Sequence, residues 1–389
     1  MSCRQPHGVP GQPHGVLGQP HGVPRQPHGV PRQPHGVLGQ PHGVLGQPHG
    51  VAPTVLMQIV FVDSDEFGGY DMGMEIYPYK FRPIFKERIW GGRKLAAVFG
   101  KQLPPDLKIG ESWELADLPQ DKSEIVNGPC AGMTINEVID KHGIYITGKT
   151  DYSPPFPLLI KILDANDILS VQVHPDAETC TRTGKGDPKT ECWYIIAAEP
   201  GAVIYKGLKP GTTREQFARA IAEGACADYL QKVRVNVGEC HFLPSGACHA
   251  IGPGLLIAEI QQPSDTTYRV FDWNRIDPET QQGRQLHIED ALESIHFDPS
   301  GDNLAVNTVG RLVDADEFKV DKAHQLAGCE VLPSPGVMKV MIMLTGSGRI
   351  TAEEDIETDF ARGDTLLVPA AFEGVLTITE DTEYLVATP

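Results

Sequence analysis

The chain has 389 residues, a length at which we expect two or three domains of about 100–200 residues each. Hydrophobic residues make up 40% and charged residues 22%, which is enough apolar material for packed cores and too little charge for a disordered chain. The 33 basic and 51 acidic side chains give a net charge of −18, which argues against a nucleic-acid-binding protein, because such a protein needs a basic face. An anionic small molecule would need cations gathered locally against that overall field.

Cysteine usage and apolar runs bear on the compartment. None of the eight cysteines form a Cys-x-x-Cys pair, so the sequence gives no support to a zinc ribbon or a thioredoxin-like site. In a chain of this length we expect reduced thiols and a cytoplasmic location. No run reaches the roughly 18 apolar residues of a membrane span, and residues 54–62 follow no basic segment, so we expect neither a span nor a signal peptide.

Residues 1–51 consist of a tandem repeat, in which Gln-Pro-His-Gly-Val recurs seven times with a period of seven. Pro and Gly in every repeat exclude a coiled coil, and the few apolar residues cannot bury a core. We therefore predict a disordered arm over 1–51 and a linker over 52–73. The histidines of the arm could bind metal weakly. A second interpretation is that the repeat is translated upstream DNA and that the protein itself starts at Met72 or Met74.

Residues 74–300 are expected to form a β-rich domain with helical insertions. Gly91-Gly92 within Pro83–Leu95 indicates a strand followed by a turn. Thr134–His142 indicates a short helix, because Thr134 and Glu137 match a capping box. The other elements expected are one or two buried strands in Pro157–Val173, a hairpin of Cys192–Ala198 and Ala202–Tyr205, a helix in Thr212–Lys232, strands in Val235–Ile260 and a helix in Leu286–Ile295.

Residues 301–389 return to β texture. The expected strands are Val337–Leu344, Thr365–Val368, Gly374–Ile378 and Tyr384–Val386. Short strands at roughly 8–12-residue spacing are typical of a sandwich or a barrel. We therefore predict a mainly β chain with helical insertions.

The stretch Gly238–His249 (GECHFLPSGACH) carries the most chemical information. Pro244 and Gly246 predict a tight turn between two strands, after which His249 points into the barrel. Gln172 and His174 lie two residues apart on one strand, so they share a face. Glu191 opens the next strand. One amide oxygen, two imidazoles and a carboxylate can converge on a divalent metal, and nitrogen and oxygen ligands without thiolate suit Zn²⁺, Mn²⁺, Fe²⁺ or Co²⁺.

A single histidine on a strand is more often packed than metal-bound, and it is the joint occurrence of the four residues that favours a metal site. His241, in the same stretch, is expected to be a packed side chain. Cys192 and Cys248 neighbour the candidate ligands and are expected to be core thiols facing away from the metal.

These residues also carry a resemblance. The turn resembles the second cupin motif, although Pro253 stands where an asparagine often follows. The runs FPLLIKILDA and LSVQVHPD (156–176), KTECWYII (189–196), and PSGACHAIGPG and AEIQQPSDTTYRVFDWNR (244–275) resemble type I mannose-6-phosphate isomerases of the short bacterial form. PIFKERIWGGRKL and GESWE resemble the start of that form, so the resemblance extends from Met74 to the C-terminus.

The resemblance implies a cupin (jelly-roll β-barrel) catalytic domain over 74–300 and one catalytic metal per subunit, usually zinc. The implied metal ligands are Gln172, His174, Glu191 and His249. Short forms need not use the Gln172 position, so it is the least secure ligand. The other implied site residues are Arg269 as the active-site arginine, Glu259 and Lys189 in the catalytic pocket, and Lys161 and Ser170 at positions associated with the sugar phosphate.

The implied reaction interconverts mannose 6-phosphate and fructose 6-phosphate by moving a proton between C1 and C2 through a cis-enediol(ate). A metal can polarise the substrate oxygens, and a positioned base can carry the proton. Arg269 is always protonated and suits stabilisation of the enediolate, which leaves Glu259 or a metal-bound water as the base. Lys161, Lys189 and Arg269 supply cations for a phosphate. The plainer interpretations are a strand-end lysine for Lys161 and a surface ion pair with an aspartate, Asp265 or Asp272, for Arg269.

The C-terminal part offers an internal comparison. Gly363–Pro369 (GDTLLVP) repeats the Gly-x5-Pro spacing of Gly238–Pro244, but Gly374 stands where His249 would be. We predict a second, metal-free cupin-like domain over 301–389 that packs against the catalytic barrel. The alternatives to the isomerase are a cupin oxygenase and a non-catalytic sugar-binding cupin. The sequence leaves the oligomeric state open.

Overall fold

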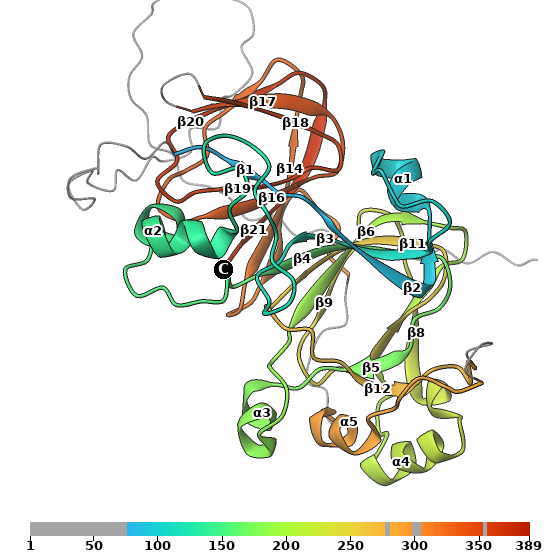
Figure 1. Cartoon of the computed structure of the whole chain (residues 1–389). Coiled ribbons are helices and arrows are strands. Elements are labelled where there is room, and N and C mark those ends of the chain that lie inside the picture. The colour runs from blue at the N-terminus through green and yellow to red at the C-terminus, as the bar shows by residue number, and fades with distance from the viewer. Residues whose placement is uncertain (1–75, 277–280, 298–304, 353–355) are drawn as a thin grey trace, which may run out of the picture. The chain divides into compact units, whose positions relative to one another are not determined.

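The computed structural model describes residues 76–276, 281–297, 305–352 and 356–389 (Figure 1). The arm and the linker predicted for residues 1–51 and 52–73 lie outside the described residues. The described chain is mainly β-structure, as predicted, and its longer strands form four antiparallel sheets, numbered I to IV below. No helix in these ranges combines the length and the apolar composition needed to cross a membrane.

Sheets I and II carry the predicted site. Sheet I has the order β2 (Ile84–Gly92), β3 (Ile109–Leu115), β4 (Leu159–Ala165), β11 (Leu255–Gln261), β6 (Glu191–Ala198) and β9 (Cys240–Leu243). Sheet II has the order β12 (Tyr268–Phe271), β5 (Val171–Val173), β10 (His249–Ile251), β7 (Val203–Leu208) and β8 (Leu230–Arg234).

Sheets III and IV hold most of the C-terminal part. Sheet III has the order β1 (Tyr79–Lys80), β19 (Thr365–Val368), β16 (Lys339–Met343), β21 (Thr382–Thr388), β14 (Lys319–Gln325) and β13 (Gly310–Asp314). Sheet IV has the order β15 (Glu330–Val331), β20 (Gly374–Ile378), β17 (Ser347–Ala352) and β18 (Glu357–Ala361). The helices of the described ranges are α1 (Lys94–Phe99), α2 (Ile135–Thr147), α3 (Ala177–Thr183), α4 (Arg214–Ala222), α5 (Ile288–Ser294) and a 3-10 turn (Cys226–Tyr229).

Strand β11 shows why sheet I is buried on both faces. Successive side chains of a strand point to opposite faces. Leu256 and Ala258 join an apolar cluster with residues of sheets III and IV, whereas Leu255 and Ile257 join a cluster with residues of sheet II. Glu259 has the parity of Leu255 and Ile257, so its side chain faces the interior between sheets I and II.

The outer face of sheet II is covered by helices α4 and α5, which lie beside it in Figure 1. Phe217 and Ile221 of α4 and Ala291 of α5 belong to one apolar cluster with Val173 and Val270 of the sheet. The apolar residues of sheet II therefore divide by parity, and the opposite face is left for polar side chains that point toward sheet I.

Residues on both sides of position 300 share one apolar core. Tyr79 of β1 pairs with Leu367 of β19, and the amide of Ala370 donates to the carbonyl of Ile146 in α2 over 2.9 Å. The cluster that contains Tyr79 and Leu367 also contains residues of β4, β6 and β11. A domain boundary at residue 300 and a separate, metal-free cupin-like domain after it stay predictions.

The predicted hairpin of Cys192–Ala198 and Ala202–Tyr205 is wrong. Strand β6 belongs to sheet I and pairs with β11 and β9, and β7 belongs to sheet II and pairs with β10 and β8. Both edges of each strand are therefore filled by other partners. The turn at Glu199-Pro200-Gly201, closed by the amide of Ala202 on the Glu199 carbonyl, carries the chain from one sheet to the other.

Other predicted elements are confirmed with changed bounds. The capping box at the start of α2 is present, with the Thr134 amide 2.7 Å from Glu137 Oε2, but the helix continues to Thr147. The helix predicted in Thr212–Lys232 ends at Ala222, and Leu230 begins β8. Strands β13, β14, β15, β17 and β18 were not predicted, because stretches such as KVDKAHQ in β14 contain no apolar run.

Candidate functional site

Two rows of directly opposed residues face each other between sheets I and II. Opposed residues on neighbouring antiparallel strands present their side chains on the same face. The row on sheet I runs across five strands and consists of Trp113, Lys161, Glu259, Trp193 and His241. The row on sheet II consists of Arg269, Gln172, His249 and Lys206. Strand pairing thus gathers Lys161, Glu259, Arg269, Gln172 and His249, which are far apart in the sequence.

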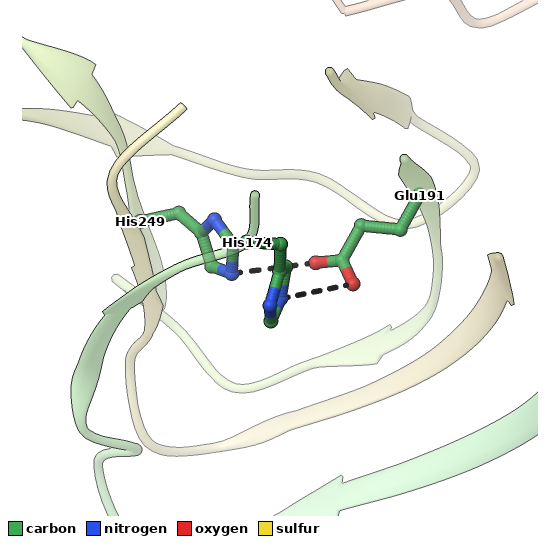
Figure 2. A group of neighbouring side chains, drawn as sticks. All are labelled: His174, Glu191 and His249. Atoms are coloured by element: carbon green, nitrogen blue, oxygen red, sulfur yellow. Dashed lines mark ion pairs between the residues drawn. The ribbon is translucent and has the colours of Figure 1, made fainter. Parts of the chain in front are cut away.

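His174, Glu191 and His249 form a compact group at the sheet II row, to which His249 belongs (Figure 2). These three residues are a candidate metal site and are called the metal group below. Their candidate ligand atoms lie within 4.8 Å of one another, and all three side chains are buried. Nε2 of His174 lies 3.5 Å from Glu191 Oε2, and Nε2 of His249 lies 3.4 Å from Oε1. His174 follows the last residue of β5, Glu191 begins β6 and His249 begins β10. The structure therefore brings three of the four candidate ligands together, and their role as metal ligands stays a prediction.

Backbone carbonyls orient both imidazoles. Nδ1 of His174 lies 2.8 Å from the carbonyl oxygen of Thr266, and Nδ1 of His249 lies 2.8 Å from that of Ala247. With its proton on Nδ1, each ring donates to the carbonyl and turns the lone pair of Nε2 toward Glu191. This is the tautomer that binding of a metal through Nε2 requires.

The four atoms that face one another lack hydrogen-bond partners. Nε2 of His174, Nε2 of His249 and Oε1 of Glu191 are buried and make no hydrogen bond in the described chain. Oε2 of Glu191 also lacks an aligned hydrogen bond, although the Lys189 ammonium lies 3.1 Å from it. Buried polar atoms in that state cost about 1–3 kcal/mol each unless something else satisfies them. Two imidazole lone pairs and a carboxylate are a donor set that suits a divalent cation, so the residues present fit a metal.

Electrostatics hold these groups in the protonation states that a metal needs. Burial, helped by the charge of Lys189, lowers the pKa of His174 to about 3, and burial lowers the pKa of His249. Burial alone would raise the pKa of Glu191, but Lys189, whose Nζ lies 3.1 Å from Oε2, and His174 hold it well below its usual value. The group is therefore two neutral imidazoles and one carboxylate at neutral pH.

Gln172 sits at the centre of the sheet II row, opposite both His249 and Arg269. Its position places it on the face that carries the metal group. Its part as a fourth ligand stays a prediction.

Glu259 is buried on the same face of sheet I as Glu191 of the metal group. It is 5% exposed, with Lys161 Nζ 3.2 Å from Oε1 and the indole nitrogen of Trp193 3.0 Å from Oε2. Burial, together with the charge of Glu191, raises the pKa of Glu259 even though Lys161 and Lys189 oppose the shift. A carboxyl group with a raised pKa beside a metal group is suited to general acid–base chemistry. Lys161 is a buried ion-pair partner, so the strand-end interpretation of this lysine is wrong.

Arg269 reaches the other end of the sheet II row. Its Nε lies 3.3 Å from Ser170 Oγ, and Nη1 donates to the carbonyl of Gln285 over 2.9 Å. Asp272, one partner considered for Arg269, is paired with Arg275 and Arg284. The guanidinium is thus held by neutral acceptors, which leaves its charge available to an anion.

Trp193 and Lys206 lie on the two rows and were not singled out from the sequence. His241, which was expected to be packed, is fully buried at the end of the sheet I row. Strand alternation from Glu191 points to Trp193, two residues on. Cys192 and Cys248 lie in the apolar clusters on the outer faces of sheets I and II, so they face away from the metal group as expected.

A hollow of about 720 Å³ lies next to the segment that holds His174 in place. Its lining includes Asp187 and residues 262–266, and the carbonyl of Thr266 in that segment is the one that accepts from His174. None of His174, Glu191 and His249 lines the hollow. The chemistry is therefore assigned from the geometry of the metal group and Glu259, not from the hollow.

Comparison with known proteins gives consistent results. A family model described as phosphomannose isomerase type I, catalytic domain, matches residues 79–197. The chain is 38% identical over 321 residues to a probable mannose-6-phosphate isomerase, GmuF, of Bacillus subtilis (strain 168), covering 80% of this chain and 99% of that protein. It is 36% identical over 289 residues to the mannose-6-phosphate isomerase of Streptococcus mutans, covering 73% of this chain and 89% of that protein.

Solved structures agree on the fold. The mannose 6-phosphate isomerase of Bacillus subtilis is similar with a TM-score of 0.70 and 29% identity, covering 80% of this chain and 99% of that one. A putative mannosephosphate isomerase of Archaeoglobus fulgidus has a TM-score of 0.66 at 20% identity, covering 81% of this chain and 98% of that one, which supports the fold alone. The predicted cupin-type β-fold is confirmed by these likenesses.

Removing one imidazole tests the metal group. For His249→Ala we expect loss of bound divalent metal. Of the three residues of the metal group, only His174 and Glu191 remain in this variant, and two side chains hold a divalent ion much more weakly than three. The measurement is elemental analysis after loading with Zn²⁺ and dialysis, with circular dichroism to check the fold. His241→Ala, which removes another fully buried histidine, is the matched control and should keep its metal. A full metal complement in His249→Ala would contradict the assignment.

Proposed function

The chain belongs to the type I phosphomannose isomerase family, and on that basis we propose that it interconverts mannose 6-phosphate and fructose 6-phosphate. The observation that carries the proposal is the buried group of His174, Glu191 and His249 with Glu259 beside it. That combination supports a metal-dependent proton transfer between neighbouring carbons of a sugar phosphate.

His174, Glu191 and His249 would hold the metal, with Gln172 as the proposed fourth ligand. We propose one Zn²⁺ per subunit, because the ligands are nitrogen and oxygen atoms from two histidines and a carboxylate. When bound, the ion would act as a Lewis acid on the substrate oxygens at C1 and C2 and lower the cost of the negative charge that develops there.

Glu259 is the proposed acid–base group. Its ionised form can take a proton from one carbon and return it to the neighbouring carbon, so a single carboxylate serves both halves of the reaction. The side chain is held at both oxygens by Lys161 and Trp193, so little reorganisation is needed when the proton moves. Burial keeps water away and prevents exchange of the transferred proton with solvent.

The cations of the site have distinct proposed tasks. Arg269 is proposed to stabilise the negative charge of the enediolate, and Lys189 keeps Glu191 ionised across 3.1 Å. Lys161 and Ser170 are proposed to contact the sugar phosphate. Ser170 accepts from Arg269, so this hydroxyl can also fix the direction of the guanidinium.

The proposed setting is carbohydrate metabolism in the cytoplasm. The described cysteines are all free, which supports a reducing compartment. A cupin oxygenase and a non-catalytic sugar-binding cupin lack any observation that favours them, and both become outcomes of the assay below.

A coupled assay on mannose 6-phosphate tests the proposed function. We expect turnover that is lost after treatment with a chelator and restored by Zn²⁺, because the metal group would be emptied and refilled. Oxygen consumption in place of fructose 6-phosphate would indicate an oxygenase, and binding without turnover would indicate a sugar-binding protein. Turnover that survives complete removal of metal would contradict the metal mechanism.

Replacement of Glu259 by glutamine tests the proton-transfer role. We expect kcat to fall by about 10²–10⁴-fold with the metal content unchanged, since the amide cannot accept the proton. The matched control is Glu114→Gln, which changes another buried carboxyl group paired with a lysine, Lys101, at 2.8 Å, on β3. Glu114 lies outside the two rows, so its variant should keep a kcat close to that of the wild type.

The pH profile gives a second view of Glu259. The base must be ionised, and burial raises its pKa above the ordinary 4.5. Activity should therefore be full above the raised pKa and fall as the pH drops through it, so the acid limb of kcat should lie above pH 4.5. An acid limb at or below the ordinary value would remove Glu259 from the proton transfer.

A further inference from the structure

Trp193 contacts both the proposed base and a proposed metal ligand. It lies in β6, two residues after Glu191, and its side chain is fully buried between sheets I and II. Its indole nitrogen lies 3.0 Å from Glu259 Oε2, and its ring lies 5.2 Å from the ring of His249. We propose that Trp193 is a positioning residue that holds Glu259 and His249 in a fixed relation to each other. This inference rests on the proposed function.

The contact with Glu259 controls the direction of the carboxylate. Lys161 Nζ lies 3.2 Å from Oε1, and the Trp193 N–H donates to Oε2. With one donor on each oxygen, rotation about the bond to the carboxyl group would break both hydrogen bonds. The indole N–H is neutral, so it orients the carboxylate without neutralising the charge that accepts the proton.

The surroundings of Glu259 show what the indole adds. The charged groups that act on it are Glu191, Lys161, Lys189 and Glu111. Each of them acts on the pKa of Glu259. Among these four described groups, Lys161 is the one that donates a hydrogen bond to it, with Nζ 3.2 Å from Oε1. Trp193 provides the second fixed contact, on the oxygen that Lys161 does not reach.

The contact with His249 is edge-to-face. The two ring planes meet at 85° with centroids 5.2 Å apart, a favourable arrangement for aromatic rings. The His249 ring is also held by the Ala247 carbonyl at Nδ1. Trp193 therefore limits the rotation of the His249 ring that the Ala247 hydrogen bond alone would allow. In this way it helps to fix the position of Nε2 relative to Glu191.

Register explains how one side chain reaches both groups. Trp193 is directly opposite Glu259 across β6 and β11, and also opposite His241 across β6 and β9. His249 stands on the facing sheet. The large, rigid indole ring of Trp193 spans the space between Glu259 on sheet I and His249 on sheet II. A smaller apolar side chain at this position would not reach both residues.

The substitution Trp193→Phe removes the N–H and keeps an aromatic ring. We expect kcat to fall about tenfold or more while KM changes less than about threefold, because the hydrogen bond to a charged group orients the base and does not hold the substrate. Loss of this donor also disfavours the ionised carboxylate, so the acid limb of kcat should move to higher pH by about one unit.

Trp273→Phe is the control for the Trp193→Phe kinetics. The indole nitrogen of Trp273 donates to the carbonyl of Leu169 over 2.7 Å, outside the two rows. This variant loses one indole hydrogen bond and should keep the wild-type acid limb. The proposal is overturned if Trp193→Phe, folded and metal-loaded, keeps the kcat and acid limb of the wild type or changes no more than Trp273→Phe.

Metal affinity gives a readout that does not depend on turnover. Trp193→Leu removes the ring that contacts His249, and we expect Zn²⁺ affinity, measured by competition with a chromophoric chelator, to fall about tenfold. Trp193→Phe should bind Zn²⁺ within about threefold of the wild type. Unchanged affinity in folded Trp193→Leu overturns the link to His249; should this variant fail to fold, the Trp193→Phe kinetics decide the proposal.

The same measurements separate this inference from the proposed function. If the wild-type protein does not convert mannose 6-phosphate, the proposed function fails. The Zn²⁺ affinities of the Trp193 variants still report on the contact with His249. If the wild type is active and only the Trp193 expectations fail, the isomerase proposal stands without this positioning role.

Discussion

The burial of the Glu191 carboxylate is the constraint on which the site depends. Its side chain is 1% exposed, and neither oxygen has a hydrogen-bond partner in the described chain. An ionised carboxylate in such a place is costly unless opposite charge surrounds it. Lys189 supplies one positive charge at 3.1 Å, and two imidazole lone pairs aimed at the same point supply none. A divalent cation among these groups would give the two imidazole nitrogens and the carboxylate the partner that they lack.

Charge alternates through the interior beyond this carboxylate. Lys189 stands next to Glu191, and Lys161 stands next to Glu259. The chain as a whole carries a net charge of −18, so cations at the site are concentrated against the overall field. Because Lys161 and Lys189 are each paired with a carboxylate, neither of these two charges is buried and unpaired when the site is empty.

Much of the site was predictable because several of its residues belong to local sequence patterns. The turn at Pro244 and Gly246 places His249 at the start of a strand, and alternation puts Gln172 and His174 on one face. The register between strands that are distant in the sequence cannot be predicted from such local patterns. Trp193 reads as an apolar core residue until β6 is paired with β11, and only then does its N–H meet Glu259.

The wrong hairpin has the same origin. A Glu-Pro-Gly turn between two apolar strands indicates a hairpin when the strands have no better partners. Here β6 and β7 are each paired on both sides within different sheets, so tertiary pairing decided the outcome. The local pattern located the turn and both strands correctly, and it failed at the one property that depends on distant residues.

X-ray absorption spectroscopy of the Zn²⁺-loaded protein tests the central claim most directly, because it reports which atoms bind the ion. We expect nearest neighbours of nitrogen and oxygen only, with the outer scattering typical of two imidazoles. Sulfur at about 2.3 Å from the ion, or a shell without imidazole, would contradict it.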